Sequence, residues 1–278
     1  MSIITLTTDF GIKDFHVSKI KGLLNIELDK PIIIDISHEV SPFNLIEGAY
    51  VIKNAYKNFP RGSIHVVDID SEETPDQSHL VIEMDEHFFI CADNGIISLI
   101  SSTIKPSKIF RINLGMQYNI TINAFVKVAA HLHRGGQLNV IGTEISEIKD
   151  LKELKPIIKS NNELSCNVIY IDNYGNVITN ITKDFFEKFH LNRSFVINAR
   201  NIEFKQIYSS YSESINFNVE KKFREEDGKK IALFNSSGFL ELSIYKSNPK
   251  ISGGASSLFG LSYGDIISIV FNDQNVNN

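Results

Sequence analysis

Three segments decide the fold of this chain: the run Ile3-Ile-Thr-Leu-Thr7, an amphipathic pattern from His16 to Leu28, and the run Pro31-Ile-Ile-Ile-Asp35. The first run predicts a short strand, and the second lacks polar alternation, which is typical of a strand buried on both faces. A second helical pattern from Phe43 to Phe59 leads to the strand-like segment Ser63-Ile-His-Val-Val-Asp68. This β-α-β-α-β order predicts parallel strands joined by right-handed crossovers.

The remainder of the chain predicts a second domain of a different class. Two apolar runs flank Asp85-Glu86 like a hairpin, and Thr121 to Leu132 has a helical pattern. Residues 147 to 162 are rich in Lys, Glu, Ser and Asn, as is typical of a connection between domains. Short β-rich runs follow at Leu164–Ile171, Ser194–Ile197, Ile231–Phe234, Phe239–Ser243 and Ile266–Val270. We therefore expect a Rossmann-like three-layer α/β domain over residues 1–152 and a small β-barrel domain over residues 160–278.

Composition excludes several classes of partner. A formal net charge of -5 without a basic cluster argues against nucleic acid binding. No apolar run approaches the roughly 20 residues of a membrane span, and the first residues lack the basic region of a secretory signal. We expect a cytoplasmic protein that binds no membrane, with Cys91 and Cys166 as buried free thiols.

Polar side chains recur where the predicted parallel strands end. Asp9 follows the first strand, Asp35-Ile-Ser-His38 ends the second, and Asp68 ends the third. Each residue alone is more often a turn residue, a helix cap or a satisfied histidine. Open α/β sheets, however, bind ligands at the carboxyl ends of their strands, so the convergence predicts a site there. Neither a dinucleotide-binding glycine motif nor a P-loop is present.

The order of these segments resembles one enzyme family, the S-adenosylmethionine (SAM) hydroxide adenosyltransferases, which are related to SAM-dependent fluorinases and chlorinases. The resemblance rests on Thr7-Thr-Asp-Phe-Gly11, Ile34-Asp-Ile-Ser-His-Glu-Val-Ser-Pro-Phe43 and Phe59-Pro-Arg-Gly-Ser-Ile-His-Val-Val-Asp68. It continues through Ala92-Asp-Asn-Gly95, Ala129-Ala-His-Leu132, Tyr170–Asn176, Asn235–Glu241, Leu258–Leu261 and Gly264-Asp265. It therefore spans nearly the whole chain.

The resemblance implies hydrolysis of SAM, without a cofactor or metal, to adenosine and methionine. It also implies a homotrimer whose SAM sites lie between the N-terminal domain of one subunit and the C-terminal domain of the next. Asp68 and His131 match the family's catalytic acid and histidine. Asp9 would hold the ribose diol, and Asp14 and Asp172 the methionine amino group. Tyr174 would stack near adenine, and polar contacts to the nucleoside would come from Asn176, Ser236, Ser237 and Glu241.

The catalytic loop departs from the family pattern. An arginine that follows the catalytic acid in the family is missing here, since no Lys or Arg occurs between Gly62 and Ile104. One alternative is therefore a SAM- or adenosine-binding protein with little turnover. A second alternative is a metal-assisted hydrolase that uses His131 and His133 with Asp68 or Glu72, although residues two apart diverge on a helix. Nothing in the sequence marks a halide pocket.

Overall fold

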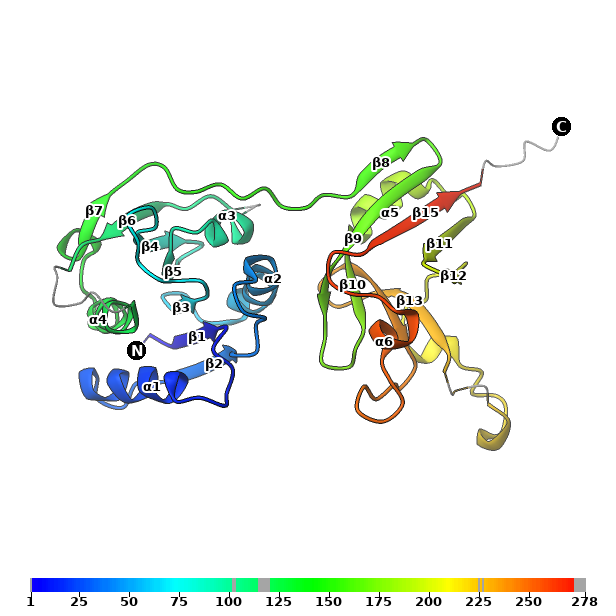
Figure 1. Cartoon of the computed structure of the whole chain (residues 1–278), viewed down its shortest axis with the longest axis horizontal. Helices are drawn as coiled ribbons and strands as arrows, with labels where there is room; N and C mark the ends of the chain where they lie inside the picture. The colour runs from blue at the N-terminus through cyan, green and yellow to red at the C-terminus, as the bar shows by residue number, and fades with distance from the viewer. Residues whose placement is uncertain (1, 102–103, 115–120, 225, 227, 273–278) are drawn as a thin grey trace. The chain divides into compact units, whose positions relative to one another are not determined.

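The computed structural model describes residues 2–101, 104–114, 121–224, 226 and 228–272 (Figure 1). The chain divides into two compact units, Met1–Glu153 and Leu154–Asn278. The domain limits 1–152 and 160–278 stay predictions. No helix among the described residues is both long and apolar enough to cross a membrane. Cys91 and Cys166 are buried free thiols, as expected.

The N-terminal unit is built on a mixed sheet of order β2-β1-β3-β5-β4-β6-β7. Its strands are β1 (Ile4–Thr8), β2 (Ile33–Ser37), β3 (Ile64–Asp68), β4 (His79–Met84), β5 (His87–Ala92), β6 (Lys108–Ile112) and β7 (Gly142–Glu144). The predicted parallel pairing is confirmed, because β1 pairs in parallel with both β2 and β3. The predicted hairpin is the antiparallel pair of β4 and β5, and β5 also lies parallel to β3.

Helices cover both faces of this sheet and complete three layers (Figure 1). They are α1 (His16–Glu27), α2 (Leu45–Ala55), α3 (Ile96–Ile100) and α4 (Thr121–His133). Val66 packs in one core with residues of α1 and α4, and Val67 packs in the other with residues of α2 and α3. Helix α2 starts later than predicted because Asn44 caps it, its side chain accepting a hydrogen bond from the Glu47 N–H.

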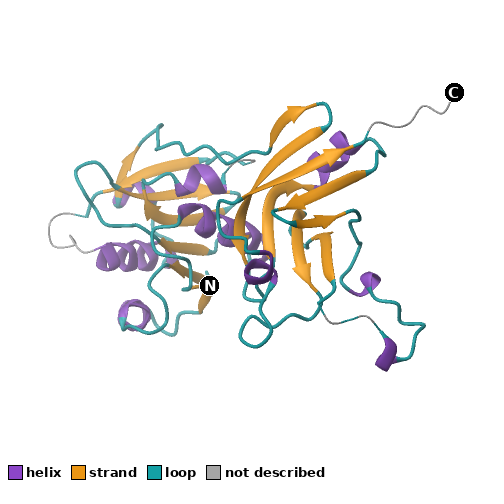
Figure 2. Cartoon of the chain, turned by 45° about the vertical axis from the view of Figure 1, so that its right-hand side comes forward, coloured by secondary structure: helices purple, strands orange, loops and turns teal. Residues whose placement is uncertain are grey.

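The C-terminal unit is an antiparallel sheet of order β12-β11-β15-β9-β10-β14-β13, with β8 paired to β9. Contacts between β12 and β13, the two edge strands of that order, nearly close it into a barrel. The elements are β8 (Ile157–Ser160), β9 (Glu163–Ile171), β10 (Val177–Thr182), α5 (Lys183–His190), β11 (Phe195–Ala199), β12 (Ile202–Phe204), β13 (Lys230–Phe234), β14 (Phe239–Ile244), α6 (Ala255–Phe259) and β15 (Ile266–Phe271). Figure 2 shows that strands are the main regular elements of this unit. The five predicted strands are confirmed, whereas β8 falls inside the stretch predicted as a connection.

Candidate active site

Asp68 ends β3 and is the most perturbed carboxyl group at this edge of the sheet. Only 3% of its surface is exposed, and its Oδ2 is buried without a hydrogen-bond partner. Burial raises the pKa of Asp68 to about 7; a hydrogen bond with Ser71 acts in the opposite direction, and the charge of Asp9 raises the pKa further. A carboxyl group that titrates near neutral pH suits a general base.

Asp9 lies beside Asp68 because the parallel register pairs Thr8, the residue before Asp9, with Asp68. Its Oδ2 accepts a hydrogen bond from the backbone N–H of Phe43 at 2.9 Å. Phe43 has a left-handed φ of 63° and an exposed ring. Such a backbone conformation is costly for an aromatic residue, so the turn before α2 is held in a strained geometry at this site. Asp14 is exposed in the loop between β1 and α1.

Asp35, in the middle of β2, carries a carboxyl group whose pKa is perturbed in the opposite direction. Burial alone would raise the pKa of Asp35, but hydrogen bonds with Lys21 and His38 lower it below its usual value. Lys21 Nζ lies 2.5 Å from Asp35 Oδ2, and His38 Nε2 lies 3.1 Å from Oδ1. The Nδ1 of His38 is 2.9 Å from the Thr8 hydroxyl. This part of the sheet therefore holds an Asp35 that is ionised at neutral pH and an Asp68 that is about half protonated there, an arrangement typical of separate chemical roles.

The loop after Asp68 is held by neutral side chains. Asn94 Nδ2 donates to the carbonyl groups of Ile69 and Asp70 at 2.9 and 3.1 Å. Gln77 Nε2 donates to the carbonyl groups of Asp70 and Glu72 at 2.8 and 3.0 Å. These amides fix the backbone, yet they supply no positive charge to Asp68.

His131 lies away from Asp68. Helix α4 begins beside the loop after β3, where the Thr121 hydroxyl donates to the Ser71 carbonyl oxygen at 3.1 Å. His131 lies about 15 Å further along that helix, and its Nε2 donates to the Gln137 carbonyl at 2.9 Å. Nearby Arg134 pairs with Glu27, at the end of α1 that leads into β2. The structure therefore places His131 near the opposite edge of the sheet and does not bring it to Asp68 within one chain.

Another histidine, His79, is the first residue of β4 and contacts the loop that follows Asp68. The residue is buried, and its Nε2 donates to the Ser71 carbonyl at 2.8 Å. Sequence reasoning missed it, although its position directly after the acidic loop was a usable signal. The metal-assisted alternative gains no support, because His131 and His133 lie away from Asp68. Among the described residues, no three His, Cys, Asp or Glu side chains gather as a metal site requires.

In the C-terminal unit, Asp172 organises the loop between β9 and β10. Its Oδ1 accepts hydrogen bonds from the backbone N–H groups of Tyr174 and Asn176, and its Oδ2 accepts one from Asn176 Nδ2 at 2.9 Å. The Cα of Gly254 lies so close to Gly175 that a side chain at Gly175 would collide with it. Tyr174 is 66% exposed, so its ring is available as a stacking surface.

Glu241 on β14 lies in the same part of the unit as Asp172. It is 3% exposed, and its Oε1 accepts hydrogen bonds from Tyr211 Oη at 2.6 Å and Ser243 Oγ at 2.5 Å. Burial raises the pKa of Tyr211, and the charges of Glu241 and Asp172 raise it further. The structure therefore brings Asp172 and Glu241 together around Tyr211, which sequence reasoning had not singled out.

Ser236 and Ser237 lie elsewhere. They occupy the turn between β13 and β14, where Asn235 Oδ1 accepts a hydrogen bond from the Ser237 N–H. That turn contacts the residue after β10, since the Lys183 N–H donates to the Gly238 carbonyl at 2.8 Å. The Asp172 loop precedes β10, so the two groups sit at opposite ends of that strand.

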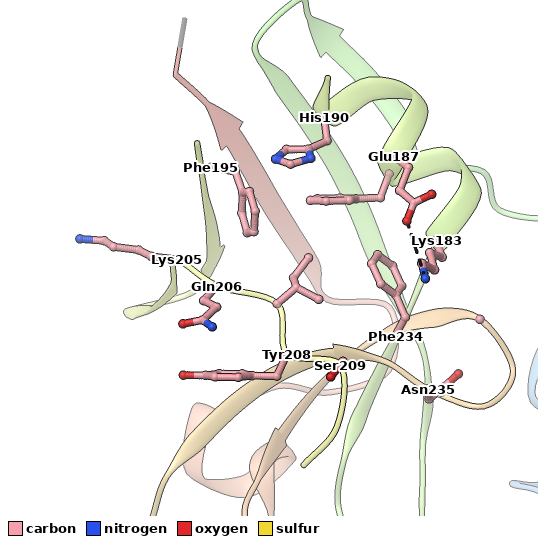
Figure 3. A pocket seen from close by; sticks show the side chains of 13 residues that line it. Lys183, Glu187, His190, Phe195, Lys205, Gln206, Tyr208, Ser209, Phe234 and Asn235 are labelled. Atoms are coloured by element: carbon pink, nitrogen blue, oxygen red, sulfur yellow. Dashed lines mark ion pairs between the residues drawn. The ribbon is translucent and has the colours of Figure 1, made fainter. Parts of the chain in front are cut away.

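A pocket of about 620 Å³ lies between α5 and the segment before Ser209 (Figure 3). Phe186, Phe195 and Phe234 form much of its wall, and an ion pair of 3.8 Å joins Lys183 to Glu187 on its rim. None of the predicted site residues lines it. The candidate site therefore stays at the ends of the strands, because a large volume alone is not evidence of a functional site.

Comparison with known proteins identifies the family. The model of the SAM hydroxide adenosyltransferase N-terminal domain matches residues 4–142, and the model of the C-terminal domain matches residues 166–268. The chain belongs to the SAM hydroxide adenosyltransferase family.

Two relatives that share one name match this chain over most of their length. A protein of Methanocaldococcus jannaschii named (R)-S-adenosyl-L-methionine hydrolase is 34% identical over 98% of this chain and 97% of its own. One of Thermus thermophilus with that name is 21% identical over 92% of this chain and 95% of its own. The structure is also similar to the crystal structure of an uncharacterized conserved protein from Thermotoga maritima, with a TM-score of 0.79, 25% identity, and coverage of 96% of this chain and 100% of that one.

Proposed function

We propose that this chain is a SAM hydrolase that converts SAM and water to adenosine and L-methionine. The observation that carries the proposal is Asp68, a buried carboxyl group with an unpartnered oxygen and a pKa near 7 in a member of this family. The family relatives named as SAM hydrolases support the same reaction. Their names specify the (R) sulfonium epimer, and we propose the same preference here.

The chemistry is an in-line displacement at C5′ of the ribose. The water oxygen forms a bond to C5′ as the C5′–S bond breaks. The electron pair of the C5′–S bond goes to sulfur. The sulfonium thereby leaves as the neutral thioether of methionine, which requires neither a general acid nor a cofactor. Ionised Asp68 accepts the proton that water releases. The protein's further task is to align water opposite the C–S bond.

The remaining roles follow the family resemblance. In this proposal Asp9 binds the ribose diol, and Asp14 and Asp172 pair with the methionine ammonium group. Tyr174 stacks near adenine, and polar contacts to the nucleoside come from Asn176 and Glu241. The resemblance assigns the same role to Ser236 and Ser237, but these residues lie at the far end of β10 from the Asp172 loop, so that role has no geometric support within one chain. A role for His131 at the same site has no geometric support within one chain. We further propose a cytoplasmic homotrimer in which each SAM contacts N-terminal residues of one subunit and C-terminal residues of the next.

The binding-protein alternative is not favoured. The missing arginine removes a positive charge, but Asp68 retains the protonation equilibrium that a general base needs at neutral pH. The relative that is 34% identical over nearly the whole chain is named as a hydrolase. Loss of one cation is therefore a reason to expect a different pH dependence rather than an inactive protein.

The decisive experiment is incubation of the purified protein with (R)- and (S)-epimers of SAM, in buffers with and without chloride. Adenosine, 5′-chloroadenosine and methionine are followed by chromatography. We expect adenosine and methionine in equal amounts from the (R) epimer, no chlorinated product, and loss of turnover in Asp68→Asn. Stoichiometric SAM binding without product from the wild type would overturn the proposal.

A further inference from the structure

Three contacts tie the segment that follows β2 to the residues around Asp9. The Thr8 hydroxyl lies 2.9 Å from His38 Nδ1, and the Gly11 N–H donates to the His38 carbonyl at 2.7 Å. The Phe43 N–H donates to Asp9 Oδ2 at 2.9 Å. His38 therefore contacts residues on both sides of Asp9, once with its side chain and once with its backbone.

The register of the sheet places His38 beside Thr8. The pairing of β1 with β2 shifts by one residue between Leu6 and Thr7, so that Thr7 pairs with Ser37. Such a bulge changes the direction of the side chains that follow it. Thr8 and His38 come directly after this pair, and both are buried. A hydrogen bond between two buried polar side chains fixes their positions more firmly than a contact at the surface.

The two ring nitrogens of His38 have different partners. Nε2 lies 3.1 Å from Asp35 Oδ1 and has no other partner among the described residues. Because a carboxylate only accepts, the ring proton lies on Nε2, and Nδ1 is left to accept from the Thr8 hydroxyl. Lys21 Nζ lies 2.5 Å from the other oxygen of Asp35 and favours its ionised form. The orientation of the imidazole is thus fixed from both sides.

The Thr8 hydroxyl links His38 to the turn that carries Asp9. Since its proton points to the imidazole, its oxygen is free to accept from the Phe10 N–H, which lies 3.4 Å away. Gly11 has a left-handed φ of 68°, which glycine adopts readily, and its N–H reaches the His38 carbonyl. The backbone is therefore held both before and after Asp9.

We propose that His38 is a positioning residue, which holds Asp9 in the orientation that binds the ribose diol. This inference rests on the proposed function, in which Asp9 binds that diol. His38 touches neither water nor substrate in this proposal, because Nδ1 is bound to Thr8 and Nε2 faces Asp35. A carboxylate that is already held in one orientation binds the diol more tightly, since less conformational freedom is lost on binding.

The test compares His38→Leu with His38→Asn. Leucine and asparagine have nearly the same shape, but only asparagine offers an acceptor near the position of Nδ1. Isothermal titration calorimetry measures the binding of adenosine and of 2′-deoxyadenosine. Wild type should prefer adenosine by ~10-fold or more, because 2′-deoxyadenosine lacks one hydrogen bond to a charged acceptor. We expect His38→Leu to lower this preference by ~3-fold or more, whereas His38→Asn should keep most of it.

Two threonine variants of unchanged shape separate this contact from a general loosening of the sheet. Thr8→Val removes the hydroxyl that binds His38 and should lower the preference to the same extent as His38→Leu. Thr5→Val removes a matching buried hydroxyl on the same strand, which lies 2.7 Å from His65 Nδ1, and should leave the preference unchanged. If His38→Leu folds poorly, Thr8→Val carries the test.

Turnover provides a second readout. The diol contact is the same in the bound substrate and in the transition state, so its weakening should raise KM for SAM by ~3- to 10-fold and leave kcat within about 2-fold of wild type. The proposal is overturned if the preference for adenosine is unchanged in both His38→Leu and Thr8→Val. It is also overturned if His38→Asn loses as much as His38→Leu, if Thr5→Val loses as much as Thr8→Val, or if kcat falls while KM stays the same.

The binding data distinguish this proposal from the proposed function. If wild type makes no adenosine from SAM but its preference for adenosine depends on His38, the hydrolase assignment fails while the role of His38 in nucleoside binding stands. If wild type shows no preference, or Asp9→Asn retains it in full, Asp9 does not bind the diol. The positioning role is then refuted, although adenosine formation by wild type would still support the hydrolysis.

Discussion

Replacement of Asp68 by asparagine should stabilise the protein at alkaline pH while it abolishes turnover. The pKa of Asp68 is about 7 in the folded protein and close to 3.9 in an unfolded chain. The folded state therefore binds more protons than the unfolded state between those values, so this group lowers the stability as pH rises. The penalty is absent below about pH 4, grows up to about pH 7 and is complete above that.

The size of the penalty follows from the pKa difference. A shift of ~3 units at ~1.4 kcal/mol per unit gives an upper value of ~4 kcal/mol at pH 8, of which ~2.5 kcal/mol develops between pH 5 and pH 8. Because Asp68 is buried, solvent screens little of this amount. Asparagine has nearly the same shape and carries no charge, so Asp68→Asn should lose the penalty.

The assay is urea denaturation of wild type and Asp68→Asn at pH 5 and pH 8, followed by far-UV circular dichroism at one protein concentration, since self-association changes apparent stability. We expect the variant to gain on wild type by roughly 2 kcal/mol between the two pH values. A difference that is the same at both pH values would refute the argument. So would a wild type that gains on the variant at pH 8.

Three further predictions concern the site. Asp68→Asn should lower kcat at least ~100-fold, as loss of a general base does. His131→Asn should lower kcat far less, and a kinetic comparison of the two variants decides whether His131 belongs to the site. In a homotrimer with shared sites, inactive Asp68→Asn and Asp172→Asn proteins should regain SAM hydrolysis when they are unfolded and refolded together, but not when refolded separately. Tyr211→Phe removes the hydrogen bond to buried Glu241 and should cost about 1–3 kcal/mol in thermal unfolding; a smaller loss would mean that water replaces the tyrosine hydroxyl.

The sequence predicted the N-terminal strand ends well because parallel βαβ units leave little freedom. Once β1, β2 and β3 are parallel, the carboxyl ends of these strands must meet at one edge, and Asp9 and Asp68 do so. Asp35 lies in the middle of β2, in register with Leu6, and is therefore set back from that edge. The five predicted strands of the C-terminal unit were likewise readable from their apolar runs. Strand β10 (Val177–Thr182) was not predicted. It directly follows the segment Tyr170–Asn176, which the sequence analysis had assigned to ligand binding.

The position of His131 could not be read in the same way. The residues of a helix are spread along its axis. A helical pattern over residues 121–132 therefore does not show which end of the helix lies beside the carboxyl ends of the strands. Only the contact between Thr121 and Ser71 orients α4 and places its first turn, rather than its last, beside Asp68. The hydrogen bond from His79 to the same Ser71 carbonyl could not be predicted either, because a contact with a backbone carbonyl leaves no side-chain motif.

These contacts also bear on why a member of this family can lack the loop arginine. A cation beside Asp68 would lower its pKa, which keeps the carboxylate ionised but makes it a weaker base. Here burial and Asp9 raise the pKa instead, and only the Ser71 hydroxyl acts in the opposite direction. The carboxylate is then a stronger base, but at pH 7 only about half of the molecules carry it ionised. The hydrolysis should therefore be fastest on the alkaline side of neutrality, where Asp68 is ionised. In that pH range the ionisation of buried Asp68 lowers the stability of the folded protein.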